Sequence, residues 1–298
     1  AALIIIIIGL GNGVIFYNQF FGDLSSNFKE TIEISELQYH QLILSDGKQI
    51  SIPGDTLKIH YQSNDSSFTI NSRKFYYDPG KKNSFNKLSV PFGKVALIDL
   101  SDGTNIWLNS GSDFIYPDVF NKKERKVFIT GEGFFKVATN KNKPFKVETG
   151  ILDVVAYGTS FNVSSYSNDD RIQAILVEGK ISVNKKGIHR LGKGILLEPS
   201  HKLEYNKHTK KIDTKKIEVK HYVSWKDGFI YLNDESFENI VKKLSRIYNI
   251  NIHVANNLRN LYFSGKLDIS RDLKTTLEIL SAAYTIEYNF HSDKLFIK

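Results

Sequence analysis

The sequence predicts a mainly β, hairpin-rich domain followed by a small two-layer α+β domain. Three observations support this prediction. From about residue 30 to 220, short runs rich in valine, isoleucine, phenylalanine, tyrosine and threonine alternate with turn residues. After about residue 222, apolar residues recur with a helical period. The chain has 298 residues, enough for about two domains of ~100–200 residues each.

The first residues predict an N-terminal transmembrane helix. Residues 1–22 carry no charge, and the first 21 of them would form a helix of ~31 Å, close to the ~30 Å hydrocarbon core of a bilayer. Aromatic residues cluster at the end of this run, where an interfacial belt would lie. The apolar region of a cleaved signal peptide and a buried core helix are the alternatives. Since the sequence contains no methionine, we expect it to be the C-terminal part of a longer protein.

Four stretches are expected to form β-hairpins. HQLILSDGKQISIP (40–53) and VALIDLSDGTNIWLN (95–109) each place Ser-Asp-Gly between two apolar runs. Asp-Gly favours the positive backbone angles of a two-residue hairpin turn. VFITGEGFFKV (127–137) and ILVEGKISV (175–183) follow the same pattern around glycines.

The last part of the chain predicts the order β-α-β-β-α-β-β. The first helix is expected to begin after Ser236 as its N-cap. Its apolar face has residues at i, i+3, i+4, i+7 and i+10: Phe237, Ile240, Val241, Leu244 and Ile247. The second helix is expected after Ser270 as its cap, with Leu273, Leu277 and Leu280 facing inward. This order describes a domain of about 75 residues.

Composition excludes several kinds of chemistry. The absence of cysteine excludes disulfides, cysteine nucleophiles and cysteine-type zinc sites. The net charge of +8 raises nucleic-acid binding as an interpretation, but the lysines are scattered and the densest run, NKKERK (121–126), contains a glutamate. No nucleic-acid-binding motif is present. We therefore expect a solvated basic surface and no nucleic-acid partner.

Several long motifs resemble the FecR family. VPFGKVALIDLSDGTNIWLNSGSDFIYP (90–117) resembles the opening of a FecR-type domain. Further pieces follow in the family's order, at residues 125–149, 154–166, 174–183 and 191–199. The stretch from SWKDGF to the C-terminus resembles the small domain that often follows FecR domains in Bacteroidetes-type proteins, which is similar to the secretin and TonB short N-terminal domain. The resemblance covers about residues 40 to 298.

The resemblance implies an anti-sigma regulator of cell-surface signalling that is not an enzyme and has no cofactor. Such a protein crosses the inner membrane once, with its C-terminal bulk in the periplasm. It senses the signalling domain of a TonB-dependent outer-membrane transporter and relays the signal to an extracytoplasmic-function sigma factor, with periplasmic and intramembrane proteases as further partners. The sigma factor binds a cytoplasmic N-terminal segment that is missing from this sequence. The expected domains are a transmembrane segment (1–22), a membrane-proximal β region (23–89), a FecR domain (90–221) and a C-terminal domain (222–298).

Gly158 and Thr159 form the candidate site of covalent chemistry. An N-to-O acyl shift needs a hydroxyl directly after a glycine, and self-cleavage at a Gly-Thr bond is known for some FecR-type regulators. The alternative is a glycine turn followed by a β-branched strand residue.

Other candidate groups favour structural roles. The eight histidines are spread along the chain without a metal-binding spacing. Glu132 and Glu178 would suit glycoside hydrolysis only at a carboxylate separation of ~5–9.5 Å. The larger aromatic residues are expected to pack in the core or across strands rather than to bind sugars; they are Trp107, Tyr116, Phe134, Phe135, Phe161 and Trp225.

Partner recognition by the C-terminal domain is expected to use strand addition at an exposed sheet edge. KLFIK (294–298) and GFIYL (228–232) are the expected edges, unless the β domain covers them. Two alternative functions stay open for the whole chain: a membrane-tethered envelope- or glycan-binding β module, and an envelope hydrolase.

Overall fold

The computed structural model describes residues 33–63, 66–77, 85–186, 194–283, 286–291 and 294–298. The predicted transmembrane segment, residues 1–22, lies outside them. None of the helices in the described ranges is both long enough and apolar enough to cross a membrane.

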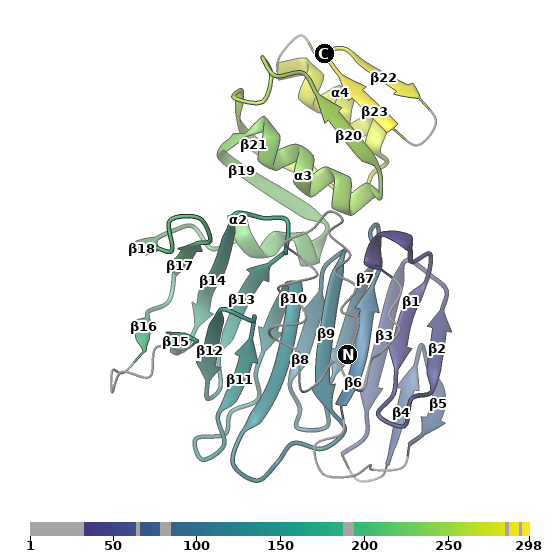
Figure 1. Cartoon of the computed structure of the whole chain (residues 1–298), viewed down its shortest axis with the longest axis vertical. Coiled ribbons are helices and arrows are strands. Elements are labelled where there is room, and N and C mark those ends of the chain that lie inside the picture. Colours follow the sequence, from purple (N-terminus) through teal and green to yellow (C-terminus); the bar gives the residue numbers. More distant parts are fainter. Residues whose placement is uncertain (1–32, 64–65, 78–84, 187–193, 284–285, 292–293) are drawn as a thin grey trace, which may run out of the picture. The chain divides into compact units, whose positions relative to one another are not determined.

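Residues 40–216 are here called the β domain, and the described residues among them form 18 connected strands (Figure 1). The strands make two sheets that share β10 (Arg125–Lys136). The first sheet runs in the order β2 (Gln49–Ile52), β1 (His40–Ile43), β6 (Phe85–Val90), β9 (Ser112–Pro117), β10, β11 (Phe145–Glu148), β12 (Leu152–Ala156), β15 (Ile181–Lys185) and β16 (Ile195–Leu197).

The second sheet runs in the order β5 (Arg73–Tyr76), β4 (Ser67–Ile70), β3 (Thr56–Tyr61), β7 (Val95–Asp99), β8 (Asn105–Leu108), β10, β13 (Ser160–Ser165), β14 (Arg171–Glu178), β17 (His201–Asn206) and β18 (Ile212–Lys216). Neighbouring strands are antiparallel except for β10–β11 and β3–β7.

The core of the β domain follows from alternation along its strands. In β3, TLKIHY, every second side chain is buried, as expected for a strand with one face in the core. Both sheets contribute to a single buried cluster, for example through Leu42 of β1, Ile59 of β3 and Tyr205 of β17. Strands β1 to β5 come from the region expected to be membrane-proximal, and they belong to the same sheets and the same core.

The prediction of a hairpin at residues 127–137 is wrong. These residues lie in β10, a single strand whose first half pairs with β9 and β11 and whose second half pairs with β8 and β13. Gly131 lies at the change of sheet with a φ of +103°. A Cβ atom there would come within 2.4 Å of the Ser112 Oγ. The glycine therefore permits a bend and a close approach between strands, not a turn.

The prediction of a hairpin at residues 175–183 is also wrong. Its two strands, β14 and β15, do not pair with each other: β14 pairs with β13 and β17, whereas β15 pairs with β12 and β16. Gly179, with a φ of +88°, turns the chain from one sheet to the other. A turn signal is local, whereas strand pairing here depends on partners elsewhere in the chain.

The two Ser-Asp-Gly hairpins are present, with a longer loop than predicted. Leu44 and Leu100 each pair through the backbone with the residue four positions later, at 2.8 and 2.9 Å. The loops therefore have three residues, Ser-Asp-Gly, and only their glycines, Gly47 and Gly103, have positive φ. This is the three-residue hairpin with glycine in the left-handed position.

Residues 229–297, here called the terminal domain, have the predicted order. The elements are β19 (Phe229–Ser236), α3 (Phe237–Tyr248), β20 (Asn251–Val254), β21 (Tyr262–Asp268), α4 (Leu273–Ala283), β22 (Tyr288–His291) and β23 (Lys294–Ile297). β19 pairs with β21, and β23 lies between β20 and β22. A separate buried cluster forms the core of this domain. The short helices α2 (Lys220–Val223) and η3 (Ser224–Asp227) connect it to the β domain, and η2 (Ile34–Glu36) precedes β1.

The helix caps and the sheet edges refine the prediction. Ser236 caps α3 as predicted, since its side chain accepts a hydrogen bond from the Asn239 amide. The cap of α4 is Asp272 and not Ser270, because the Asp272 Oδ1 accepts from the Thr275 amide at 2.9 Å. The prediction of KLFIK as an edge is wrong, because β23 is the central strand of its sheet. Among the described strands, β19 pairs only with β21.

Candidate functional site

Arg246 joins the terminal domain to the β domain. It lies in the last turn of α3, yet only 8% of the residue is exposed. Its guanidinium donates to both carboxylate oxygens of Asp169 and, at 2.7 Å, to the Oδ1 of Asn168. The guanidinium carbon also lies 3.8 Å from the ring centroid of Tyr166. Bidentate pairing combined with stacking on an aromatic ring is a geometry that lysine does not reproduce.

The backbone at the end of α3 makes a second contact with the β domain. The amide of Gly93, in the loop between β6 and β7, donates to the Arg246 carbonyl oxygen at 2.8 Å. The position of Tyr166 is fixed by its hydroxyl, which donates a hydrogen bond to the Ser110 carbonyl oxygen at 2.8 Å. Two loops of the β domain therefore hold the C-terminal end of α3.

A buried carboxyl group links the β domain to the connecting helix. The two oxygens of Glu132 in β10 accept from the Asn109 amide group at 2.8 Å and from the Asn162 amide group at 2.9 Å. The Asn162 Oδ1 accepts from the Trp225 Nε1 at 3.3 Å. Burial raises the pKa of Glu132 and outweighs the two amide hydrogen bonds that lower it. We interpret Glu132 as a group that orients Asn162 toward Trp225.

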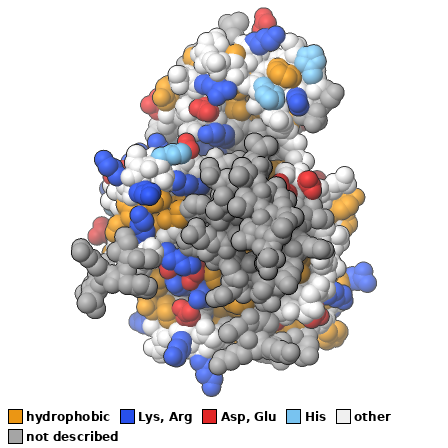
Figure 2. Space-filling view, viewed as in Figure 1, with side chains coloured by type: hydrophobic (Ala, Val, Ile, Leu, Met, Phe, Trp, Pro, Cys, Tyr) orange, Lys and Arg blue, Asp and Glu red, His pale blue; other side chains and the backbone are white. Residues whose placement is uncertain are grey.

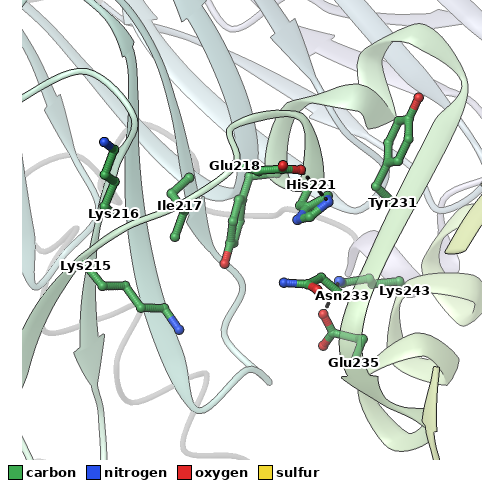
Figure 3. A pocket seen from close by; sticks show the side chains of 10 residues that line it. Lys215, Lys216, Ile217, Glu218, His221, Tyr231, Asn233, Glu235 and Lys243 are labelled. Atoms are coloured by element: carbon green, nitrogen blue, oxygen red, sulfur yellow. Dashed lines mark hydrogen bonds and ion pairs between the residues drawn. The ribbon is translucent and has the colours of Figure 1, made fainter. Parts of the chain in front are cut away.

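A cleft of ≈ 770 Å³ lies between the end of β18, helix α2, strand β19 and helix α3 (Figure 3). Alternation along β19, together with an irregularity in the strand between Leu232 and Glu235, produces one of its walls. Ile230 and Leu232 are buried in the core of the terminal domain, whereas Tyr231, Asn233 and Glu235 line the cleft.

Most charges around the cleft are paired. Glu235 forms an ion pair with Lys243 at 3.2 Å, and Glu218 lies 3.3 Å from the His221 Nε2. Among the described residues, neither Lys215 nor Lys216 has an ion-pair partner or a side-chain hydrogen bond. Figure 3 shows Lys215 directed into the space that Asn233 faces. Figure 2 shows the other lysines and arginines of the viewed face spread among acidic and apolar side chains.

The candidate cleavage site has a packing role. Gly158 has a φ of +146°, and a Cβ atom there would lie 2.4 Å from the Thr139 Oγ1. Thr159 is 7% exposed, and its buried hydroxyl has no hydrogen-bond partner, and so no base, among the described residues. Close packing alone therefore explains the glycine. Cleavage stays a prediction, which the intact mass of the purified chain tests directly.

Glu132 and Glu178 are not brought together. Glu132 is buried, whereas Glu178 is exposed at the end of β14. They lie on opposite sides of β13, paired with Ser164 and Ser160 respectively. Their α-carbons are thus separated by two strand spacings of ~4.8 Å and by four residues of ~3.3 Å along the strand. That distance does not suit the carboxylate pair of a glycosidase.

The remaining predicted candidates also have structural contacts. Within the described ranges no group of three or more His, Asp or Glu side chains is arranged to hold a metal ion. Phe135 stacks on Phe161 at 5.2 Å, and Trp107 packs edge-on against Phe134 at 5.6 Å. Tyr116 is fully buried. These five aromatic rings form core and cross-strand packing, as predicted, whereas Trp225 is half-buried in η3 and belongs to neither core.

The sequence did not predict the contact that joins the two domains. Arg246 lies outside the apolar spacing of its helix, so it resembles any solvated arginine. The SNDD turn (167–170) that receives it resembles any polar loop. Only the tertiary structure brings the two segments together, and no local signal in either one predicts the contact.

Comparison with known proteins agrees with this two-domain organisation. Residues 86–182 match the family model described as FecR protein, and residues 229–297 match the model described as FecR, C-terminal. The first match spans β6 to the beginning of β15, and the second spans the terminal domain. None of the curated proteins matches the chain.

Two crystal structures of a proposed anti-sigma factor from Parabacteroides distasonis ATCC 8503, at 1.65 Å and 2.50 Å, are similar to this chain. Each is 28% identical with a TM-score of 0.65. The matches cover 71% and 72% of this chain and 98% of each crystallised chain.

Proposed function

Because the chain belongs to the FecR family of anti-sigma regulators, we propose that it regulates an extracytoplasmic-function sigma factor from the inner membrane. In this proposal the chain crosses the membrane once, and residues 33–298 lie in the periplasm. The terminal domain docks the signalling domain of a TonB-dependent outer-membrane transporter. Docking is relayed through the β domain and the membrane segment, with proteolysis by periplasmic and intramembrane proteases as a further step.

The Arg246 contact is the observation that best supports a relay. A partner changes a conformational equilibrium only if it binds one state better than the other. The ion pair of Arg246 with Asp169 gives the two domains a specific joined state. Docking that competes with this pair would favour a separated state, and the exposure of the β domain would change with it.

The proposal is tested by titrating the purified chain with signalling domains of transporters from the same organism, using calorimetry. We expect one of them to bind with micromolar affinity. In cells, deleting the gene is expected to change transcription from promoters of the cognate sigma factor. If no signalling domain bound the folded chain and transcription were unchanged, both parts of the proposal would fail.

A further inference from the structure

Lys215 occupies an electrostatically unfavourable position. In the β17–β18 pair it lies directly opposite Lys202. Like charges at directly opposite positions of an antiparallel pair destabilise it. Lys202 is compensated, since its Nζ donates to Glu204 at 2.7 Å. Lys215 is exposed and has no ion pair within the described part of the chain, so its ammonium is solvated and free to pair with a ligand.

The cleft has room for an anionic ligand beside the Lys215 ammonium. The Lys215 ammonium points into the cleft from one wall, and the exposed Asn233 faces it from the other (Figure 3). An amide side chain both donates and accepts, so it matches the alternating groups of a peptide backbone. The ring of Tyr222 adds an apolar surface and is held by Lys202, whose Nζ lies 5.2 Å from its centroid.

The surrounding sequence reinforces the positive charge. Residues 208–221, HTKKIDTKKIEVKH, contain five lysines and two acidic residues. β18 lies within this stretch and pairs on one side only, with β17, among the described strands. The charge of the segment is complementary to an acidic chain.

We propose that this cleft binds an extended acidic peptide segment of a partner protein. Lys215 pairs with a carboxylate side chain of that segment, and Asn233 hydrogen-bonds its backbone. This proposal does not depend on which transporter or sigma factor the regulator serves. The peptide-binding proposal and the proposed regulatory function can therefore be disproved separately.

The presence of Lys215 on the edge strand β18 can also be explained without a peptide ligand. Charged side chains on unpaired strands also prevent edge-to-edge association. That role predicts that loss of Lys215 causes self-association and leaves peptide affinity unchanged. Peptide binding predicts the reverse, a monodisperse variant with weakened affinity.

The test uses the purified full chain and a fluorescein-labelled hexapeptide of alternating glutamate and threonine. Fluorescence anisotropy measures its binding. We expect saturable binding that falls about three- to fivefold in Lys215→Thr, the upper end of the range for the loss of one exposed ion pair. Asn233→Ala is expected to weaken binding independently. The matched control is Lys211→Thr, which makes the same charge change in the same basic stretch but outside the cleft, and it is expected to change the affinity less than about twofold.

Several outcomes would overturn the proposal. They are absence of binding, equal binding of a peptide with glutamine in place of glutamate, and an equal loss of affinity in Lys211→Thr and Lys215→Thr. Full displacement of the peptide by inorganic phosphate would indicate a simple anion site instead. Thermal unfolding supplies a second readout: Lys215→Thr is expected to be at least as stable as the wild type, because the repulsion from Lys202 is removed. A destabilised variant would contradict that account of the site.

Discussion

His40 is a buried histidine whose neutral form suits the fold. Its Nε2 lies 3.1 Å from the Val95 carbonyl oxygen, and its Nδ1 makes no hydrogen bond with any residue that the structure describes. Burial lowers the pKa of His40, and the hydrogen bond with the Val95 carbonyl oxygen only partly opposes this. The unfolded chain takes up this proton near pH ~6.5, before the folded chain does.

The stability contributed by His40 is therefore complete above the unfolded pKa and is lost as the pH falls from ~6.5 toward the lowered folded value. The slope for one proton is at most ~1.4 kcal/mol per pH unit. We expect His40→Gln, which keeps a donor for Val95, to unfold in urea with a smaller dependence on pH between 7.5 and 5.5. The control is His60→Gln, because the His60 side chain is 52% exposed. Equal flattening in both variants would contradict the assignment.

Gly158 tests how much close packing the fold requires. A methyl group there would meet Thr139 within 2.8 Å at three atoms, and the φ of +146° is unfavourable for alanine. We expect Gly158→Ala to lower the free energy of unfolding by roughly 2 kcal/mol or more, from strain and overpacking together. Gly265→Ala is the matched control, since Gly265 has a φ of +152° and open space around it. Equal losses in the two variants would show that the contact with Thr139 is unimportant.

At the scale of single elements, helix α4 begins at a cap that the sequence analysis placed two residues early. Asp272 satisfies the Thr275 amide, whereas the Ser270 hydroxyl donates to the Asp268 carboxylate at 2.5 Å. We expect Asp272→Ala to destabilise the protein by ~1 kcal/mol, the usual value of an N-cap. Ser270→Ala is expected to cost less, because it removes a hydrogen bond at the exposed end of β21. Chemical denaturation of both variants distinguishes the two caps. A larger loss of unfolding free energy in Ser270→Ala than in Asp272→Ala would show that Ser270 is the cap, as the sequence predicted.

Elements that depend on local order were predictable from the sequence. Helix α3 has its apolar spacing and its serine cap within 13 residues, so both were identified. β10 was not, because glycine in a strand and glycine in a turn give the same local signal. Gly131 is explained by Ser112, a contact 19 residues away in the sequence. The central position of β23 has the same kind of cause, since its residues pair with residues of the parallel strand β20 that lie 43 positions earlier.

At the scale of the whole molecule, the β domain and the terminal domain have separate cores and a polar connection. Arg246 contacts the 166–169 turn, and Trp225 contacts Asn162. A polar connection between two independent cores suits a reversible contact, since separating the domains exposes groups that water can solvate. A continuous apolar interface would instead hold the domains together in one state.

The domain connection leads to a prediction about Arg246→Met, which keeps an unbranched apolar stem in place of the arginine stem but removes the guanidinium with its charge and its donors. The Asp169 carboxylate then loses both guanidinium hydrogen bonds, a cost of about 1.5–3 kcal/mol for bonds to a charged group. Because this loss falls on the connection and not on either core, we expect the two domains to unfold less cooperatively. Calorimetry should show the transition broaden or divide, with faster hydrogen exchange in η3 and at the end of α3.

The matched control is Arg259→Met in the same domain, where the arginine is about half exposed and its guanidinium lies 3.8 Å from Glu238. Loss of so exposed a pair should leave the cooperativity of unfolding unchanged. If both variants unfolded like the wild type, Arg246 would contribute packing and no coupling. If Arg246→Met alone divided the transition, the same variant would report on the relay: a signalling domain that competes with the Arg246 contact should bind it more tightly than it binds the wild type, because the competing state has already been weakened.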